Sequence, residues 1–119
     1  MMNTNNTILV ESKKFAVRII RLYQFLTTEK KELILSKQLL RSGTSIGANV
    51  RESINAQSTM DFIHKMNIAL KEGNETEYWL ELLHETDYLD EIQFASIYSD
   101  CSSIVAILTK IIKTCKEKV

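Results

Sequence analysis

The sequence predicts an all-α protein, an antiparallel up-down-up-down four-helix bundle. The chain of 119 residues contains no proline and only three glycines, whereas all-β folds need these residues for their many turns. Apolar residues recur at steps of three and four in four long stretches joined by short polar connections. The length fits one domain. We therefore expect a flexible N-terminal tail over residues 1–7 and a single bundle domain over residues 8–119.

The first helix is predicted from Ile8 to Leu26. Its apolar stripe, spaced for one helical face, consists of Phe15, Ile19, Leu22 and Leu26. This helix carries four basic residues and a single acidic one. The basic residues are the candidates for a nucleic-acid-binding face: Lys13, Lys14, Arg18 and Arg21. The alternative interpretation is an ordinary solvated helix face.

Polar segments mark the expected starts of the next two helices. Thr27 or Thr28 is a suitable N-cap for a second helix over residues 29–57. The segment Ser58–Asp61 resembles a capping box, with aspartate in place of glutamate, at the start of a third helix over residues 59–86.

Small residues fill the middle of the second predicted helix, from Ser42 to Ala48. Gly43 and Gly47 lie one turn apart on its apolar stripe, and each helical glycine costs about 1 kcal/mol relative to alanine. We therefore predict that another helix packs very closely against Gly43 and Gly47. The alternative is that the helix breaks at this point.

The third helix has two apolar faces and must contact more than one neighbour. Its first apolar line consists of Phe62, Met66, Ala69, Gly73, Thr76, Leu80 and Leu83, and its second of Ile63, Leu70, Trp79 and Leu82. A fourth helix is expected over residues 91–116. Basic residues in its last turns suit the negative end of a helix: Lys110, Lys113, Lys116 and Lys118.

The net charge is zero, but its distribution is uneven. Residues 1–60 hold nine Lys and Arg against four Asp and Glu, a net charge of +5, and residues 61–119 have a net charge of −5. Basic and acidic helices that pair within or between subunits explain this distribution; a basic face for an acidic partner is the alternative. A turn centred near Ser58 predicts an interhelical salt-bridge ladder formed by Lys37, Arg41, Glu75, Glu77 and Glu81.

No catalytic or metal-binding motif is recognisable, so we expect no enzyme activity, metal or cofactor. His64 and His84 belong to no Glu-x-x-His motif, and there is no Cys-x-x-Cys. Cys101 and Cys115 are fourteen residues apart on one predicted helix, which corresponds to about 21 Å, too far for a disulfide. The minor alternative is an enzyme that uses Glu75, Glu77 and His84 at a subunit interface.

The sequence also carries expectations about compartment. Free thiols are typical of a reducing environment, the first seven residues lack the apolar core of a signal peptide, and the apolar stretches are short compared with a membrane span. We therefore expect a cytoplasmic protein that makes no contact with a membrane.

Two segments resemble the four-helix-bundle family of proteins encoded by ribosomal RNA intervening sequences. They are LLRSGTSIGANVRES at Leu39–Ser53 and AQSTMDFIHKMNIALKEGNETEYWLELL at Ala56–Leu83. The matching positions are Arg41, Ser45-Ile46, Ala48-Asn49, Phe62, Glu75, Glu77, Tyr78, Trp79 and Leu80. The resemblance extends over about residues 15–116. Where many members have Ala-Glu-Gly, this chain has Val50-Arg51-Glu52.

The resemblance implies a homopentamer of side-by-side bundles without enzyme activity. A related protein, the accessory variability determinant of diversity-generating retroelements, binds nucleic acid and a reverse transcriptase through basic surfaces, although it is far more basic than this chain. The leading hypothesis is therefore a non-enzymatic homo-oligomer that binds RNA or a ribonucleoprotein. The alternative is a protein-interaction scaffold that makes no contact with nucleic acid.

Overall fold

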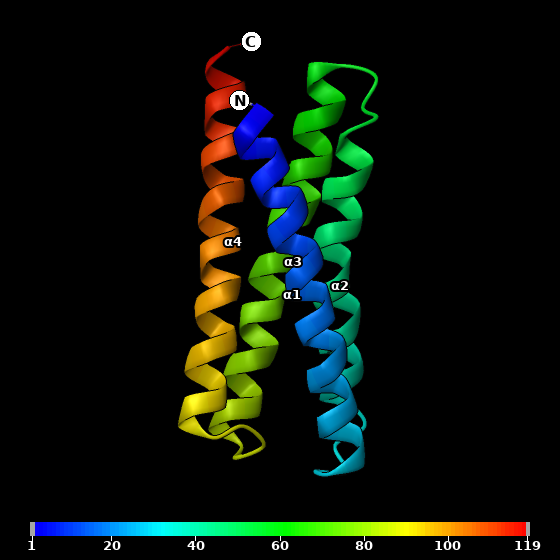
Figure 1. The fold of residues 1–119 in the computed structure, drawn as a ribbon, viewed down its shortest axis with the longest axis vertical. Coiled ribbons are helices and arrows are strands. Elements are labelled where there is room, and N and C mark those ends of the chain that lie inside the picture. The colour runs from blue at the N-terminus through cyan, green and yellow to red at the C-terminus, as the bar shows by residue number, and fades with distance from the viewer. Residues whose placement is uncertain (1, 119) are drawn as a thin grey trace.

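The computed structural model describes the backbone of residues 2–118 and the side chains of residues 7–118. The described chain forms four helices: α1 (Met2–Thr28), α2 (Leu35–Ser53), α3 (Thr59–Glu85) and α4 (Glu91–Glu117). Consecutive helices run in opposite directions along a body of 47 × 21 × 19 Å (Figure 1). The predicted all-α fold is thus confirmed.

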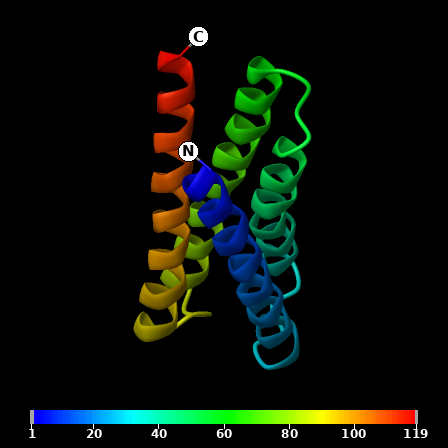
Figure 2. The same ribbon diagram turned by 45° about the horizontal axis from the view of Figure 1, so that its top comes forward.

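The α1 helix closes the bundle obliquely. Its N-terminal end lies beside α4, and its C-terminal end lies beside α2 (Figures 1 and 2). As a result α1 packs more closely against α2 than against α4, while α3 packs against both α2 and α4. The two apolar lines of α3 account for its central position.

The core is continuous along the bundle axis and contains one small polar layer. Buried apolar side chains from all four helices fill it, among them Phe15, Leu39, Met66, Leu80 and Leu108. In the middle, the Thr76 hydroxyl lies 2.9 Å from the Ser42 hydroxyl and 2.7 Å from the carbonyl oxygen of Glu72. Every buried polar side-chain atom of the described residues has a hydrogen-bond partner.

The ends of α1 differ from the predicted ones. The helix begins at Met2, so the backbone of residues 2–7, predicted as a tail, continues it. The hydroxyls of Thr27 and Thr28 donate backwards to the carbonyls of Tyr23 and Gln24, at 2.9 and 2.7 Å. They belong to the last turn of α1 and do not cap α2, so the predicted cap is wrong.

The α2 helix begins at Leu35, six residues later than predicted, and its cap is a carboxylate. Lys31 turns the chain with a φ of 58°. Glu32, only 7% exposed, then accepts hydrogen bonds from the backbone N–H groups of Ile34, Leu35 and Ser36, at 3.1, 3.0 and 2.6 Å. Burial opposes the charge, but these donors outweigh it and hold the pKa of Glu32 below its ordinary value.

The α2 helix is continuous through its glycines as far as Ser53, so a break there is ruled out. A Cβ atom added to Gly43 would lie 2.8 Å from Ile19 Cγ1 of α1. One added to Gly47 would lie 3.2 Å from the backbone oxygen of Ser12, also on α1. Both glycines therefore lie where α1 crosses α2 most closely.

The starts of α3 and α4 are well capped. The Ser58 side chain accepts from the N–H of Asp61 at 3.0 Å, at the predicted start of α3. Asp90 and Gln93 form a full capping box at the start of α4, which sequence analysis missed.

Among the described helices, α4 alone is long and apolar enough to cross a membrane by length and composition, with a mean hydropathy of 1.3 over an 18-residue window. The expectation that every apolar stretch was too short is therefore wrong for α4. A core helix of a soluble protein meets the same criterion, and α4 buries Ile97, Cys101, Ile104 and Leu108 in this core.

Candidate nucleic-acid interface

The four basic residues proposed for α1 do not share one surface. Lys14 and Arg18 line a groove between α1 and α4. Lys13 instead lines a groove between α1 and α2. Arg21 is exposed one turn after Arg18. The two grooves differ in how their charges are balanced.

The α1/α4 groove, of about 410 Å³, is nearly neutral. Arg18 Nη1 lies 2.6 Å from Asp100 Oδ2, and Arg18 Nη2 donates to Ser96 Oγ at 3.1 Å. Lys14 Nζ lies 3.9 Å from Glu11 Oε2. Each cation therefore has a carboxylate partner, and the groove offers a phosphate little net attraction.

The α1/α2 groove, also of about 410 Å³, holds two cations and no acidic residue. Lys13 on α1 and Arg51 on α2 flank it, and small or apolar residues form its floor, among them Val10 and Gly47. Neither cation forms an ion pair with any residue of 7–118. Glu52, the neighbour of Arg51 in sequence, pairs instead with Lys65 of α3 at 3.1 Å.

Sequence analysis missed Arg51 as a member of this site. The signal was present, because Arg51 stands where many members of the resembling family carry a glutamate. Arg51 is exposed, so this difference in charge lies on the surface beside the crossing of α1 and α2.

An apolar stripe runs along the exposed side of α1, beside Lys13. Val10, Val17 and Ile20 are 48%, 46% and 42% exposed. Exposed apolar side chains that form a contiguous stripe bordered by charged residues are a candidate surface for contact with another macromolecule.

Arg41 connects α2 to α3. Its guanidinium bonds to the carboxylates of Glu72, at 3.3 Å, and of Glu75. Glu75 also accepts a hydrogen bond from Trp79 Nε1 at 3.0 Å. This indole bond and the Arg41 charge together hold the pKa of Glu75 below its ordinary value, against the effect of burial.

The rest of the predicted ladder has different partners. Lys37 is exposed and forms no ion pair within residues 7–118. Glu77 accepts from the Ser102 hydroxyl at 3.0 Å, and Glu81 accepts from the Tyr98 hydroxyl at 2.6 Å. The reason is that these carboxylates lie on different faces of α3: residues 77 and 81 face α4, whereas residues 72 and 75 face α2. The bond to Glu81 raises the pKa of Tyr98.

Replacing Glu75 with alanine removes the acceptor of the indole bond and is expected to change the surroundings of Trp79 more than the stability. Arg41 is half exposed, so loss of its ion pair costs about 0.5 kcal/mol. Trp79 is the only tryptophan, so its fluorescence emission maximum reports this bond directly. Glu85→Ala, which removes an exposed carboxylate on the same helix, is the matched control. An unchanged emission maximum in Glu75→Ala would show that the indole bond is not formed.

The residues considered for catalysis do not converge. Glu75 faces Arg41, Glu77 faces Ser102, and His84 Nε2 lies 3.0 Å from Glu91 Oε2 while its ring stacks on Phe94. Within the described part of the chain, no group of three or more His, Cys, Asp and Glu could hold a metal ion.

Both cysteines are buried and free. Burial, with the nearby charges of Glu77 and Asp100, raises the pKa of the Cys101 thiol to about 12. Its sulfur lies 3.5 Å from the carbonyl oxygen of Gly73. Because the thiolate is the reactive form, Cys101 is a core residue and a poor nucleophile.

A family model and a solved structure both match this chain over most of its length. A model of the 23S rRNA-intervening sequence protein family matches residues 4–110. A crystal structure from Bacteroides thetaiotaomicron, described as a protein with unknown function from the S23 ribosomal protein family, is 57% identical to this chain. The match covers 92% of this chain and 98% of that one, with a TM-score of 0.91. No protein with a curated description matches this chain.

Proposed function

The chain belongs to the 23S rRNA-intervening sequence protein family, and from that premise we propose that it is a non-enzymatic, self-associating helical bundle that binds RNA or a ribonucleoprotein. The observation that carries this proposal is the α1/α2 groove, where Lys13 and Arg51 flank a site without a counter-charge. An arginine fork and a lysine point charge are the side chains that recognise phosphate oxygens.

The placement of the grooves changes which residues we assign to the RNA. Arg18 is engaged by Asp100 and Ser96, so it contributes less free charge than its position in the sequence indicated. Lys13, Arg21 and Arg51 are exposed and have no ionic partner among residues 7–118. We assign the phosphate contacts to these three residues.

Self-association is supported by the apolar stripe of Val10, Val17 and Ile20, about half exposed on α1. Burying such side chains contributes favourably to association. The proposed number of five subunits comes from the family resemblance. The same stripe favours the second candidate function, a protein-interaction scaffold, which differs from the first in having no affinity for RNA.

The double variant Lys13→Ala/Arg51→Ala is expected to weaken RNA binding several-fold. Log K for RNA binding falls linearly with the logarithm of the salt concentration. The loss of two phosphate contacts on a single strand makes this slope less steep by about 1.4. The measurement is fluorescence anisotropy with a short labelled RNA of mixed sequence across a salt series. Light scattering with and without RNA gives the mass of the assembly.

The matched control is Lys14→Ala/Arg18→Ala, which removes the same charge from the balanced α1/α4 groove and is expected to bind nearly as the wild type does. If the control loses more affinity than Lys13→Ala/Arg51→Ala, the assignment to the α1/α2 groove is wrong. If the protein is an oligomer that does not bind RNA even at low salt, the protein-interaction scaffold is the better account of its function.

A further inference from the structure

We propose a second anion-binding site, a groove between the first half of α3 and the last turns of α4 that binds the phosphodiester backbone of RNA. Its ligand class rests on the proposed function, but its surface is separate from the α1/α2 groove. The groove has a volume of about 450 Å³ and is lined by Asn67, Leu70, Thr109, Ile112, Lys113, Lys116 and Glu117.

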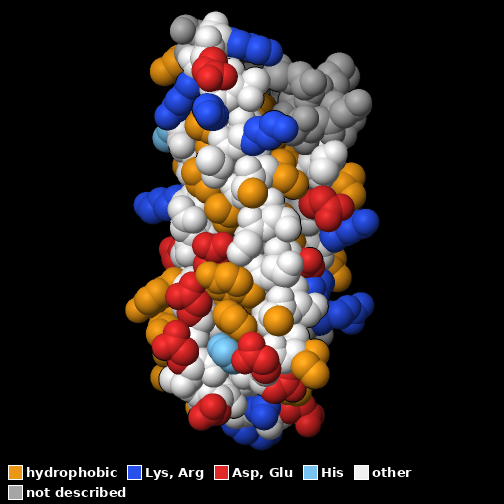
Figure 3. All heavy atoms as spheres, turned by 90° about the vertical axis from the view of Figure 1, so that its left-hand side faces the viewer, with side chains coloured by type: hydrophobic (Ala, Val, Ile, Leu, Met, Phe, Trp, Pro, Cys, Tyr) orange, Lys and Arg blue, Asp and Glu red, His pale blue; other side chains and the backbone are white. Residues whose placement is uncertain are grey.

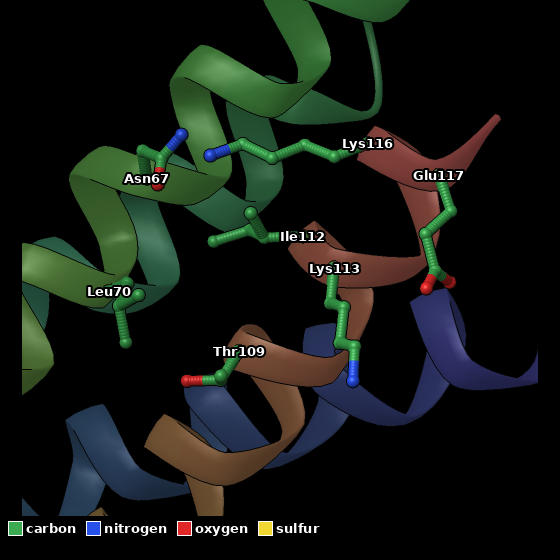
Figure 4. Close-up of a pocket in the computed structure, with 7 residues that line it drawn as sticks. All are labelled: Asn67, Leu70, Thr109, Ile112, Lys113, Lys116 and Glu117. Atoms are coloured by element: carbon green, nitrogen blue, oxygen red, sulfur yellow. The ribbon is translucent and has the colours of Figure 1, made fainter. Parts of the chain in front are cut away.

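Polar groups from both helices converge over this groove. Figure 4 shows that the side chain of Lys116 extends from α4 across the opening and ends near the amide of Asn67 on α3. Leu70 and Ile112 lie beneath them. An ammonium and a carboxamide that approach one point can donate to the same phosphate group or to a ribose hydroxyl.

The end of α4 holds a concentration of cations. Lys110, Lys113, Lys116 and Lys118 lie within nine residues against one acidic residue, Glu117. None of the four lysines forms an ion pair within residues 7–118. On this face of the molecule, basic side chains gather toward one end and acidic side chains toward the other (Figure 3).

The helix dipole does not account for these lysines. Its effect is confined to the last turn, and α4 ends at Glu117. Lys116 lies in that turn, but Lys110 and Lys113 precede it. Two of these lysines, Lys113 and Lys116, line the groove. The groove therefore offers an anion two cations that have no ion pair within residues 7–118.

The floor of the groove favours a polyanion over an acidic protein helix. A docked helix needs apolar pockets for its anchor side chains. Here the apolar lining consists of Ile112, which is only 6% exposed, and Leu70, which is half-buried. The open groove therefore has no enclosed apolar pocket for such an anchor. The groove also lacks an aromatic lining residue on which a base could stack, so backbone contact is the remaining mode.

The test uses the variant Lys113→Ala/Lys116→Ala and labelled single-stranded RNA across a salt series. Both lysines are exposed and alanine suits a helix interior, so the variant is expected to fold, which circular dichroism checks. We expect a several-fold loss of RNA affinity. We also expect the slope of log K against the logarithm of the salt concentration to be less steep by about 1.4. The control is Lys30→Ala/Lys37→Ala, which removes the same charge at the opposite end of the bundle and is expected to bind as the wild type does.

The outcomes separate this inference from the proposed function. RNA binding that depends on Lys13 and Arg51 but not on Lys113 and Lys116 overturns the inference alone. An equal loss in the α4 variant and its control shows a general charge effect and also overturns it. If polyglutamate displaces the labelled RNA as effectively as unlabelled RNA does, the groove binds an acidic protein and the inference is overturned. A wild-type protein that binds no RNA contradicts both proposals.

Discussion

Replacing Gly43 with valine is expected to lower the free energy of unfolding by about 3 kcal/mol, although valine has the higher helix propensity. The new Cβ atom would lie 2.8 Å from Ile19 Cγ1 and 2.9 Å from Ile19 Cγ2. These atoms are at the base of a buried, branched side chain, so they cannot rotate away. The helices must separate, and that exposes the core between α1 and α2. Chemical denaturation measures the loss.

A double-mutant cycle tests this cause. Ile19→Ala alone creates a cavity and costs about 3 kcal/mol, but it removes the atoms that the valine meets. The double variant should therefore be much more stable than the sum of the two losses predicts. Ala48→Val is the control on the exposed side of α2 and should cost less than about 1 kcal/mol, mostly through the lower helix propensity of valine. Near-wild-type stability of Gly43→Val would mean that the two helices are not in close contact.

Replacing Glu32 with alanine is expected to cost about 2.5 kcal/mol, because one carboxylate accepts from three backbone N–H groups at the start of α2. Glu32→Gln keeps one oxygen acceptor and should cost less. Glu29→Ala, an exposed carboxylate in the same connection, is the control and should have little effect. Equal stabilities for Glu32→Ala and Glu29→Ala would contradict the capping role.

Glu32 also makes the stability depend on pH. Its pKa is lower in the folded protein than in the unfolded chain, so the unfolded state binds the proton more readily. Its contribution is therefore complete above the unfolded pKa and is lost as the pH falls through the folded pKa. Denaturation midpoints measured from neutral to acid pH should fall more steeply for the wild type than for Glu32→Gln. Parallel curves would show that Glu32 does not contribute to the acid sensitivity.

The candidate interface was predictable only in part. Helical periodicity identified the cations of α1, but it could not say that Arg18 lies 2.6 Å from Asp100, a residue 82 positions away. It also could not bring Lys13 next to Arg51. Asn67 and Lys116 are separated by most of α3 and α4, and nothing in their local sequence relates them. Such neighbours depend on how the helices cross.

The sequence by itself determined the class of the fold, the extents of α3 and α4 and the cap at Ser58. These features depend on interactions within one helix or one turn, so the spacing of residues in the sequence predicts them. The tertiary structure decided the start of α2, because Glu32 caps it only when it is buried. Tertiary structure also decided which carboxylates face which helix, and which cations stay unpaired. Those outcomes depend on the rotation and crossing of packed helices, which no local pattern specifies.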